Sequence, residues 1–188
     1  MMDEMKRGIN KDDMTQTFDR CIAWIENCDT KASITLGGLG VILSILLASD
    51  YVKKISEVFQ YMLDNIGFLA GLHLCLTTLS LLAVVVGILF LLRVLIPKID
   101  TKEFEDKEIV GDSLIFFSTI AKNKSFATYK AKIEDCSEGG LLDDMLSQIY
   151  ICSLICEMKF RNYKTGLFLS IMGFLLFAAM MIIGIIAL

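Results

Sequence analysis

Two groups of charged side chains, the first with a tryptophan, lie where the chain passes from charged into apolar sequence. The first group is Arg20, Trp24, Asp29 and Lys31, and the second is Lys159, Arg161 and Lys164. Arginine matches the oxygens of a phosphate, and an aromatic face stacks on a nucleobase. We therefore predict a site for a small anionic ligand that carries a base. The predicted ligand-binding residues are Arg20, Trp24, Lys31 and Arg161. The alternative is that both groups are ordinary anchors at a membrane surface.

The other reactive residue types favour neither catalysis nor metal binding. The single histidine, His73, lies in an apolar stretch, where it cannot complete a Ser/His/Asp set or join the thiols of Cys152 and Cys156. These thiols are predicted to fill a core. The glycine-rich segment 37–40 is apolar and lacks the Gly-Lys-Ser/Thr ending of a phosphate-binding loop. We therefore predict no enzyme activity, no catalytic residue, no metal and no cofactor.

Three long uncharged runs must position these residues. They cover 32–49, 66–92 and 165–188, in a chain of 188 residues of which 55% are hydrophobic. A helix needs about 20 apolar residues to cross a bilayer. The remaining sequence is too short to bury all three runs, so each is predicted to be a transmembrane helix. The predicted partner is the lipid bilayer, and the net charge of −4 argues against nucleic acid.

The basic residues predict the orientation of these helices. Sixteen of the 18 lysines and arginines lie before the first run or between the second and third, and two lie between the first and second. Because basic segments stay in the cytoplasm, the N-terminus is predicted inside and the C-terminus outside. The predicted organisation is a cytoplasmic N-terminal helix (1–31), a first span (32–49), an outer amphipathic loop (50–65), a second span (66–92), a cytoplasmic helical region (93–164) and a third span (165–188).

Apolar residues at alternating spacings of four and three precede the first and third spans. The two seams are Met14, Phe18, Cys21, Ile25, Cys28 and Ala32, and Leu142, Leu146, Ile149, Ser153, Cys156, Phe160, Tyr163 and Leu167. Such seams indicate helices packed on other helices, within one chain or between subunits. Each helix is predicted to run unbroken into its span. The predicted fold class is therefore all-α: an integral membrane protein with three transmembrane helices, N-in and C-out, extended into a small cytoplasmic helical layer.

Local signals predict further detail of the cytoplasmic layer. The polar segment 97–111 is predicted to be a linker. Asp112 and Ser125 are each predicted to cap the start of a helix. The adjacent acids Asp143 and Asp144 suit the first turn of a helix, where negative charge is stabilised by the helix dipole.

Three segments resemble Pycsar-type transmembrane effectors. WIENCDTKA (24–32) resembles that family's entry into its first span, and SLIFFSTIA (113–121), followed by Tyr129, resembles its Phe-Phe helix. LLDDMLSQIYICSLICEMKFRNY (141–163) is similar to its acidic start, Gln-Ile-Tyr centre and basic end. The resemblance covers residues 14–188.

The resemblance implies a membrane effector of bacterial anti-phage defence in the inner membrane. A partner cyclase would make a cyclic mononucleotide, cCMP or cUMP, and the effector would impair membrane integrity or potential and cause abortive infection. Three helices enclose no lumen, so we expect a homo-oligomer, with the small-residue pairs Gly37/Gly40 and Gly67/Gly71 as candidate contacts. Two alternatives stay open: a structural or regulatory membrane subunit that binds a protein partner, and a small constitutive channel.

Overall fold

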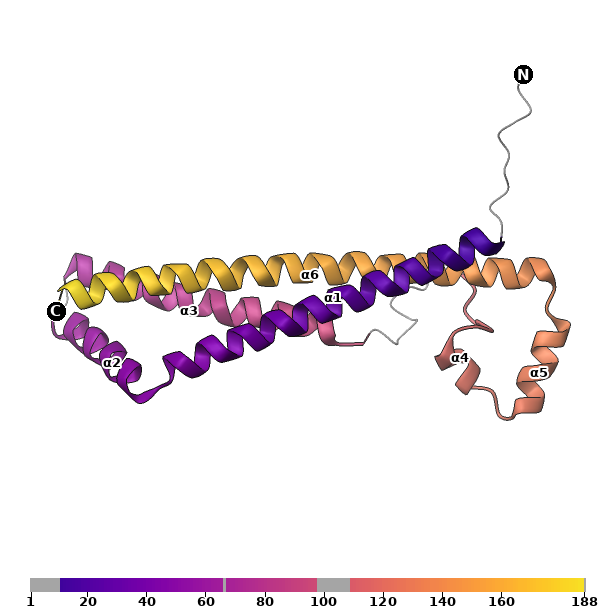
Figure 1. Cartoon of the computed structure of the whole chain (residues 1–188), viewed down its shortest axis with the longest axis horizontal. Helices are drawn as coiled ribbons and strands as arrows, with labels where there is room; N and C mark the ends of the chain where they lie inside the picture. The colour runs from indigo at the N-terminus through magenta and orange to yellow at the C-terminus, as the bar shows by residue number, and fades with distance from the viewer. Residues whose placement is uncertain (1–10, 66, 98–108, 188) are drawn as a thin grey trace, which may run out of the picture. The chain divides into compact units, whose positions relative to one another are not determined.

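The computed structural model describes residues 11–65, 67–97 and 109–187, and all regular secondary structure in these ranges is helical (Figure 1). The helices are α1 (Lys11–Leu46), α2 (Ser49–Asp64), α3 (Phe68–Leu95), α4 (Phe117–Ala121), α5 (Phe126–Asp135) and α6 (Glu138–Ala187). Three of them, α1, α3 and α6, are long and apolar enough to cross a membrane. The predicted all-α fold with three membrane helices is confirmed. The N-in, C-out orientation and the domain boundaries stay predictions, and most of the predicted linker lies outside the described residues.

The chain divides into two compact units, which are described separately. The span unit comprises residues 28–96 and 159–188, and the polar unit comprises residues 1–27 and 97–158. Helices α1 and α6 each contribute their first part to the polar unit and their second part to the span unit. None of the helices in the described residues contains a proline, because the single proline of the chain follows α3.

In the span unit, α3 and α6 pack backbone against backbone through small residues. A Cβ added to Gly166 would lie 2.8 Å from the carbonyl oxygen of Gly87, and one added to Gly173 would lie 2.8 Å from that of Ser80. No side chain fits at these positions, so the two helices approach more closely than larger residues would allow. The glycines of α1 differ, because a Cβ at Gly37 would meet nothing within 4 Å.

The segment predicted as an amphipathic loop over 50–65 forms an amphipathic helix, α2. Its apolar face is buried at Val58 and Met62, and Val58 forms a cluster with Phe177 and Met181 of α6. Val52, near the start of the helix, is exposed. The helix therefore covers part of α6 with one face and keeps its charged face outward.

Candidate ligand-binding site

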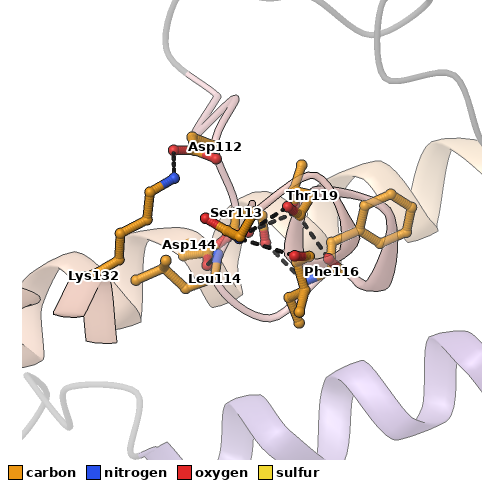
Figure 2. Close-up of polar contacts among 9 residues, drawn as sticks. Asp112, Ser113, Leu114, Phe116, Thr119, Lys132 and Asp144 are labelled. Carbon is orange, nitrogen blue, oxygen red and sulfur yellow. Dashed lines mark hydrogen bonds and ion pairs between the residues drawn. The ribbon is translucent and has the colours of Figure 1, made fainter. Parts of the chain in front are cut away.

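In the polar unit, side chains of α6 hold a loop by its backbone (Figure 2). The Asp144 carboxylate accepts the N–H of Leu114 at 2.7 Å. The Ser147 hydroxyl accepts the N–H of Val110 at 3.2 Å. Asp144 is 2% exposed, so the loop backbone takes the place of water as the partner of this carboxyl oxygen. Asp143 and Asp144 were predicted to lie in the first turn of a helix. Because α6 begins at Glu138, both lie beyond its first turn.

The next turn of this loop is organised by Ser113. Its hydroxyl accepts the N–H groups of Ile115 at 3.3 Å and Phe116 at 3.0 Å, while Thr119 donates to the Ser113 carbonyl at 2.6 Å (Figure 2). Because these bonds form a turn over residues 113–116, helix α4 begins only at Phe117. The prediction that Asp112 caps this helix is therefore wrong. Asp112 instead forms an ion pair with Lys132 at 2.7 Å.

Helix α5 also binds the same loop, through a side chain one turn after its start. Its cap is Ser125, as predicted, because that hydroxyl accepts the N–H of Thr128 at 3.2 Å. One turn later, the Tyr129 hydroxyl donates to the carbonyl of Leu114 at 2.9 Å. The backbone of Leu114 is thus bound at its N–H by α6 and at its carbonyl by α5.

The loop also corrects the predicted seam at the start of α6. Leu142 and Leu146 are exposed, while Asp144, Ser147 and Gln148 are buried. The reason is that the backbone of the loop needs polar partners, so the polar face of α6 turns toward it. The seam is correct farther along, where Cys156 is buried and Phe160 packs on a core.

A groove of about 670 Å³ opens beside this loop. It is lined by Lys11, Thr15, Phe18, Ile115, Glu138, Gly139, Leu141, Leu142 and Met145. This volume lies within the range of small-molecule sites. A cation, an aromatic ring, a carboxylate and apolar side chains line this one cavity. No sequence pattern singled out Lys11 or Phe18 as ligand contacts, because the groove forms only when α1, α6 and the loop come together.

Three thiols lie near the contact of α1 with α6 in the polar unit. Cys21 is 3.5 Å from the Ser153 hydroxyl. Burial is the main cause that raises the pKa of Cys152, and the nearby thiols of Cys21 and Cys156 add to it. Burial, and to a smaller extent the Cys21 thiol, also raises the pKa of Cys156. Within the described residues, no group of three or more His, Cys, Asp or Glu side chains is arranged to hold a metal.

The four residues predicted to bind the ligand are divided between the two units. Arg20 and Trp24 belong to the polar unit and both are exposed, with Arg20 donating to the Gln16 side chain at 3.3 Å. Lys31 and Arg161 belong to the span unit and are also exposed. The Lys31 ammonium lies 6.0 Å from the centroid of the Phe160 ring. Convergence of the four on one ligand stays a prediction.

The same sequence groups contain a pair that the predicted site left out. Lys159 is buried in the span unit, and its ammonium donates to the Asp29 carboxylate at 2.5 Å and to the Val94 carbonyl at 2.6 Å. Opposite charges at the entry to two spans were the available signal. That signal does not show which cation pairs with Asp29, since Lys159, Arg161 and Lys164 all lie just before the third span.

Comparison with known proteins gives three matches. The model of the Pycsar effector protein domain matches residues 13–186. The Pycsar effector protein GmPycTM of Gulbenkiania mobilis is 33% identical over 164 residues, which cover 83% of each chain. The Pycsar effector protein EcPycTM of Escherichia coli is 29% identical over 160 residues, which cover 84% of this chain and 82% of that relative. No solved structure matches the chain.

Proposed function

Since the chain belongs to the Pycsar effector family, we propose that it impairs the membrane of a phage-infected cell on sensing a cyclic pyrimidine mononucleotide. Membership makes it a multi-pass membrane effector of anti-phage defence. The proposed ligand is cCMP or cUMP, made by a partner cyclase, and the proposed result is abortive infection. The family match and the three apolar helices support this proposal together.

The continuity of two helices carries the mechanism. Helix α1 runs from Lys11 to Leu46 and α6 from Glu138 to Ala187, each without interruption. Each helix therefore has residues in the polar unit and residues in a predicted membrane span. A ligand that changes how the two helices pack in the polar unit acts on the spans through the same helices. This arrangement requires no separate signalling element.

The proposed ligand contacts form two sets. The first is Arg20, Trp24, Lys31 and Arg161, whose cations and ring suit a phosphate and a base. The second is the groove, where Lys11 and Phe18 offer the same two chemistries within one unit. To move a two-state equilibrium from 1:99 to 99:1, a ligand must favour one state by about 5.5 kcal/mol. Hydrogen bonds to charged groups contribute about 1.5–3 kcal/mol each, so about two to four contacts made only in the favoured state suffice.

A membrane-potential assay tests the proposal. Inverted inner-membrane vesicles that contain the protein are energised and loaded with a potential-sensitive dye, and cCMP, cUMP or a purine cyclic nucleotide is added to the medium, which faces the predicted cytoplasmic side. We expect depolarisation with one pyrimidine nucleotide and none with the purine. Depolarisation without any nucleotide would instead indicate a constitutive channel, and an unchanged potential in every arm would contradict an effector gated by these nucleotides.

Variants assign the contacts. Arg20→Ala and Arg161→Ala test the first set, and Lys11→Ala and Phe18→Ala test the groove. Lys130→Ala is the matched control, because Lys130 is an exposed lysine paired only one turn away with Glu134. The readouts are depolarisation and nucleotide binding to the purified protein. If both arginine variants bind and respond like wild type, these arginines are only interfacial anchors. A loss confined to the groove variants places the ligand there.

A further inference from the structure

Lys159 is a buried cation in a membrane protein, and its position demands a reason. Only 5% of the residue is exposed. Lysine is almost never fully buried unless it is paired. Here the ammonium donates to the Asp29 carboxylate of α1 and to the Val94 carbonyl of α3, while Lys159 itself belongs to α6. One side chain therefore joins the three membrane helices.

The bond to α3 satisfies a helix end. Helix α3 ends at Leu95, so the carbonyl of Val94 is among the last four, which have no partner within the helix. A positive charge at this end is also favoured by the helix dipole. Next to the bond, Cys28, Ala32 and Val94 form a fully buried cluster. The contact of Lys159 with α3 is thus built into a packed core.

The bond to α1 is the more accessible of the two. The Asp29 side chain is 38% exposed, against 7% for Lys159, so water can solvate the carboxylate as soon as α1 moves. Helix α1 is also the least buried of the three membrane helices. In contrast, α3 and α6 are held backbone to backbone at Gly87 and Gly166. Separation of α1 from a fixed α3–α6 pair therefore breaks the ion pair and leaves the Val94 bond intact.

We propose that the Asp29–Lys159 ion pair is a latch, which holds α1 against α3 and α6 in the resting state and opens when the effector is activated. This inference rests on the proposed function, because it assigns the pair a role in the same membrane-impairing response. It predicts that the latch limits the leak of the unstimulated protein. It also predicts that loss of the latch lowers the nucleotide concentration needed for the response.

Asp29→Asn tests the latch with little change in shape. The amide oxygen of asparagine can still accept from Lys159, but the charge attraction is lost. We expect depolarisation of cells without nucleotide, or a fall of the half-maximal nucleotide concentration by at least about fivefold, the lower limit of typical coupling between sites. Glu26→Gln is the matched control, because Glu26 is an exposed acid one turn earlier on α1. Immunoblots of the membrane fraction correct for the amount of inserted protein.

A double variant separates a latch from a simple loss of stability. Asp29→Asn leaves a buried lysine without a counter-charge, whereas Asp29→Asn combined with Lys159→Met leaves neither charge nor latch. We expect the double variant to leak as much as the single one. A double variant that is silent and responds like wild type would overturn the latch, because the leak would then come only from the unpaired lysine.

Two further outcomes are decisive. If both variants insert normally and match wild type in basal leak and in nucleotide response, or lose the response without leaking, the latch is overturned. If wild type ignores cCMP and cUMP but Asp29→Asn still leaks and Glu26→Gln does not, the nucleotide proposal fails and the latch stands.

Discussion

Gly166 of α6 faces Gly87 of α3 so closely that a Cβ on Gly166 would lie 2.8 Å from the Gly87 carbonyl oxygen and 2.9 Å from the Leu91 side chain. Both neighbours belong to one helix, and the first of them is backbone, so the contact cannot relax by a rotamer change alone. The α3–α6 pair is therefore the fixed part of the span unit. Its rigidity depends on residues that have no side chain.

We expect Gly166→Ala to lower the thermal stability of the purified protein. Its methyl group must push α3 and α6 apart, and overpacking of this kind costs about 1–3 kcal/mol. The measurement is the melting temperature in detergent. Gly38→Ala is the control, because a Cβ there meets nothing within 4 Å and alanine favours a helix. Equal melting temperatures for the two variants would contradict the close contact.

We expect Asp144→Ala to release the loop at Leu114. The substitution removes the acceptor of a 2.7 Å bond and leaves a backbone N–H without it. A hydrogen bond to a charged group contributes about 1.5–3 kcal/mol, so exchange of the Leu114 amide should speed up at least tenfold. Hydrogen–deuterium exchange of the peptide over 113–121 measures this. The exposed neighbour gives the control, and Asp143→Ala should leave exchange unchanged.

We expect the Cys152 thiol to be alkylated slowly at pH 7. Burial and the two neighbouring thiols raise its pKa, so the folded protein holds less of the reactive thiolate than an unfolded chain does at the same pH. The rate should rise as the pH increases past the ordinary thiol range. Mass spectrometry after a short maleimide pulse measures the rate, with the same protein in dodecyl sulfate as the reference. Equal rates in the two samples would disagree with a raised pKa.

The predicted orientation places α2 outside the cell. Ser56 is exposed on α2 and Lys124 is exposed in the polar unit. In intact cells we expect a membrane-impermeant maleimide to label Ser56→Cys but not Lys124→Cys, because the latter would be cytoplasmic. Permeabilised cells should label both. Labelling of Ser56→Cys only after permeabilisation would reverse the topology.

We expect the active form to contain several copies of the chain. Three membrane helices of one chain enclose no lumen, and Gly37, Gly40 and Gly71 have open space where a neighbouring helix would fit. Light scattering of the detergent-solubilised protein measures the mass, with and without nucleotide. Gly37→Leu should lower the fraction of oligomer, because the new side chain would occupy the space of a neighbouring helix. It should not disturb the chain itself, where a Cβ at Gly37 meets nothing within 4 Å. A monomer under both conditions would refute this expectation.

The sequence correctly predicted features that depend on residues close together in the chain. Ser125 was correctly identified as a cap because its bond reaches only to Thr128. Asp112 looked equally suitable, but Ser113 forms the turn and Asp112 pairs with Lys132, 20 residues away. Local spacing contains no information about that distant partner.

The contacts between helices required the structure for a related reason. Apolar spacing shows which face of a helix is buried, but it does not set the rotation of one helix against another. The buried role of Asp144 and the pairing of Lys159 with Asp29 both depend on that rotation. Lys11 and Phe18 were missed likewise, because their groove has walls from three separate segments.

The distance between Asp29 and Lys159 along the chain also fixes the order in which the molecule is completed during its synthesis. The two residues are 130 positions apart, and a ribosome adds about 5–20 residues per second, so Lys159 is made about 7–26 s after Asp29. Until Lys159 is made, Asp29 is without this counter-charge, and the Val94 carbonyl, once made, is without its cap. Helix α6 is made after α1 and α3, and its Lys159 closes the three-helix arrangement. The contact that joins all three membrane helices therefore forms only after the first part of α6 has been made.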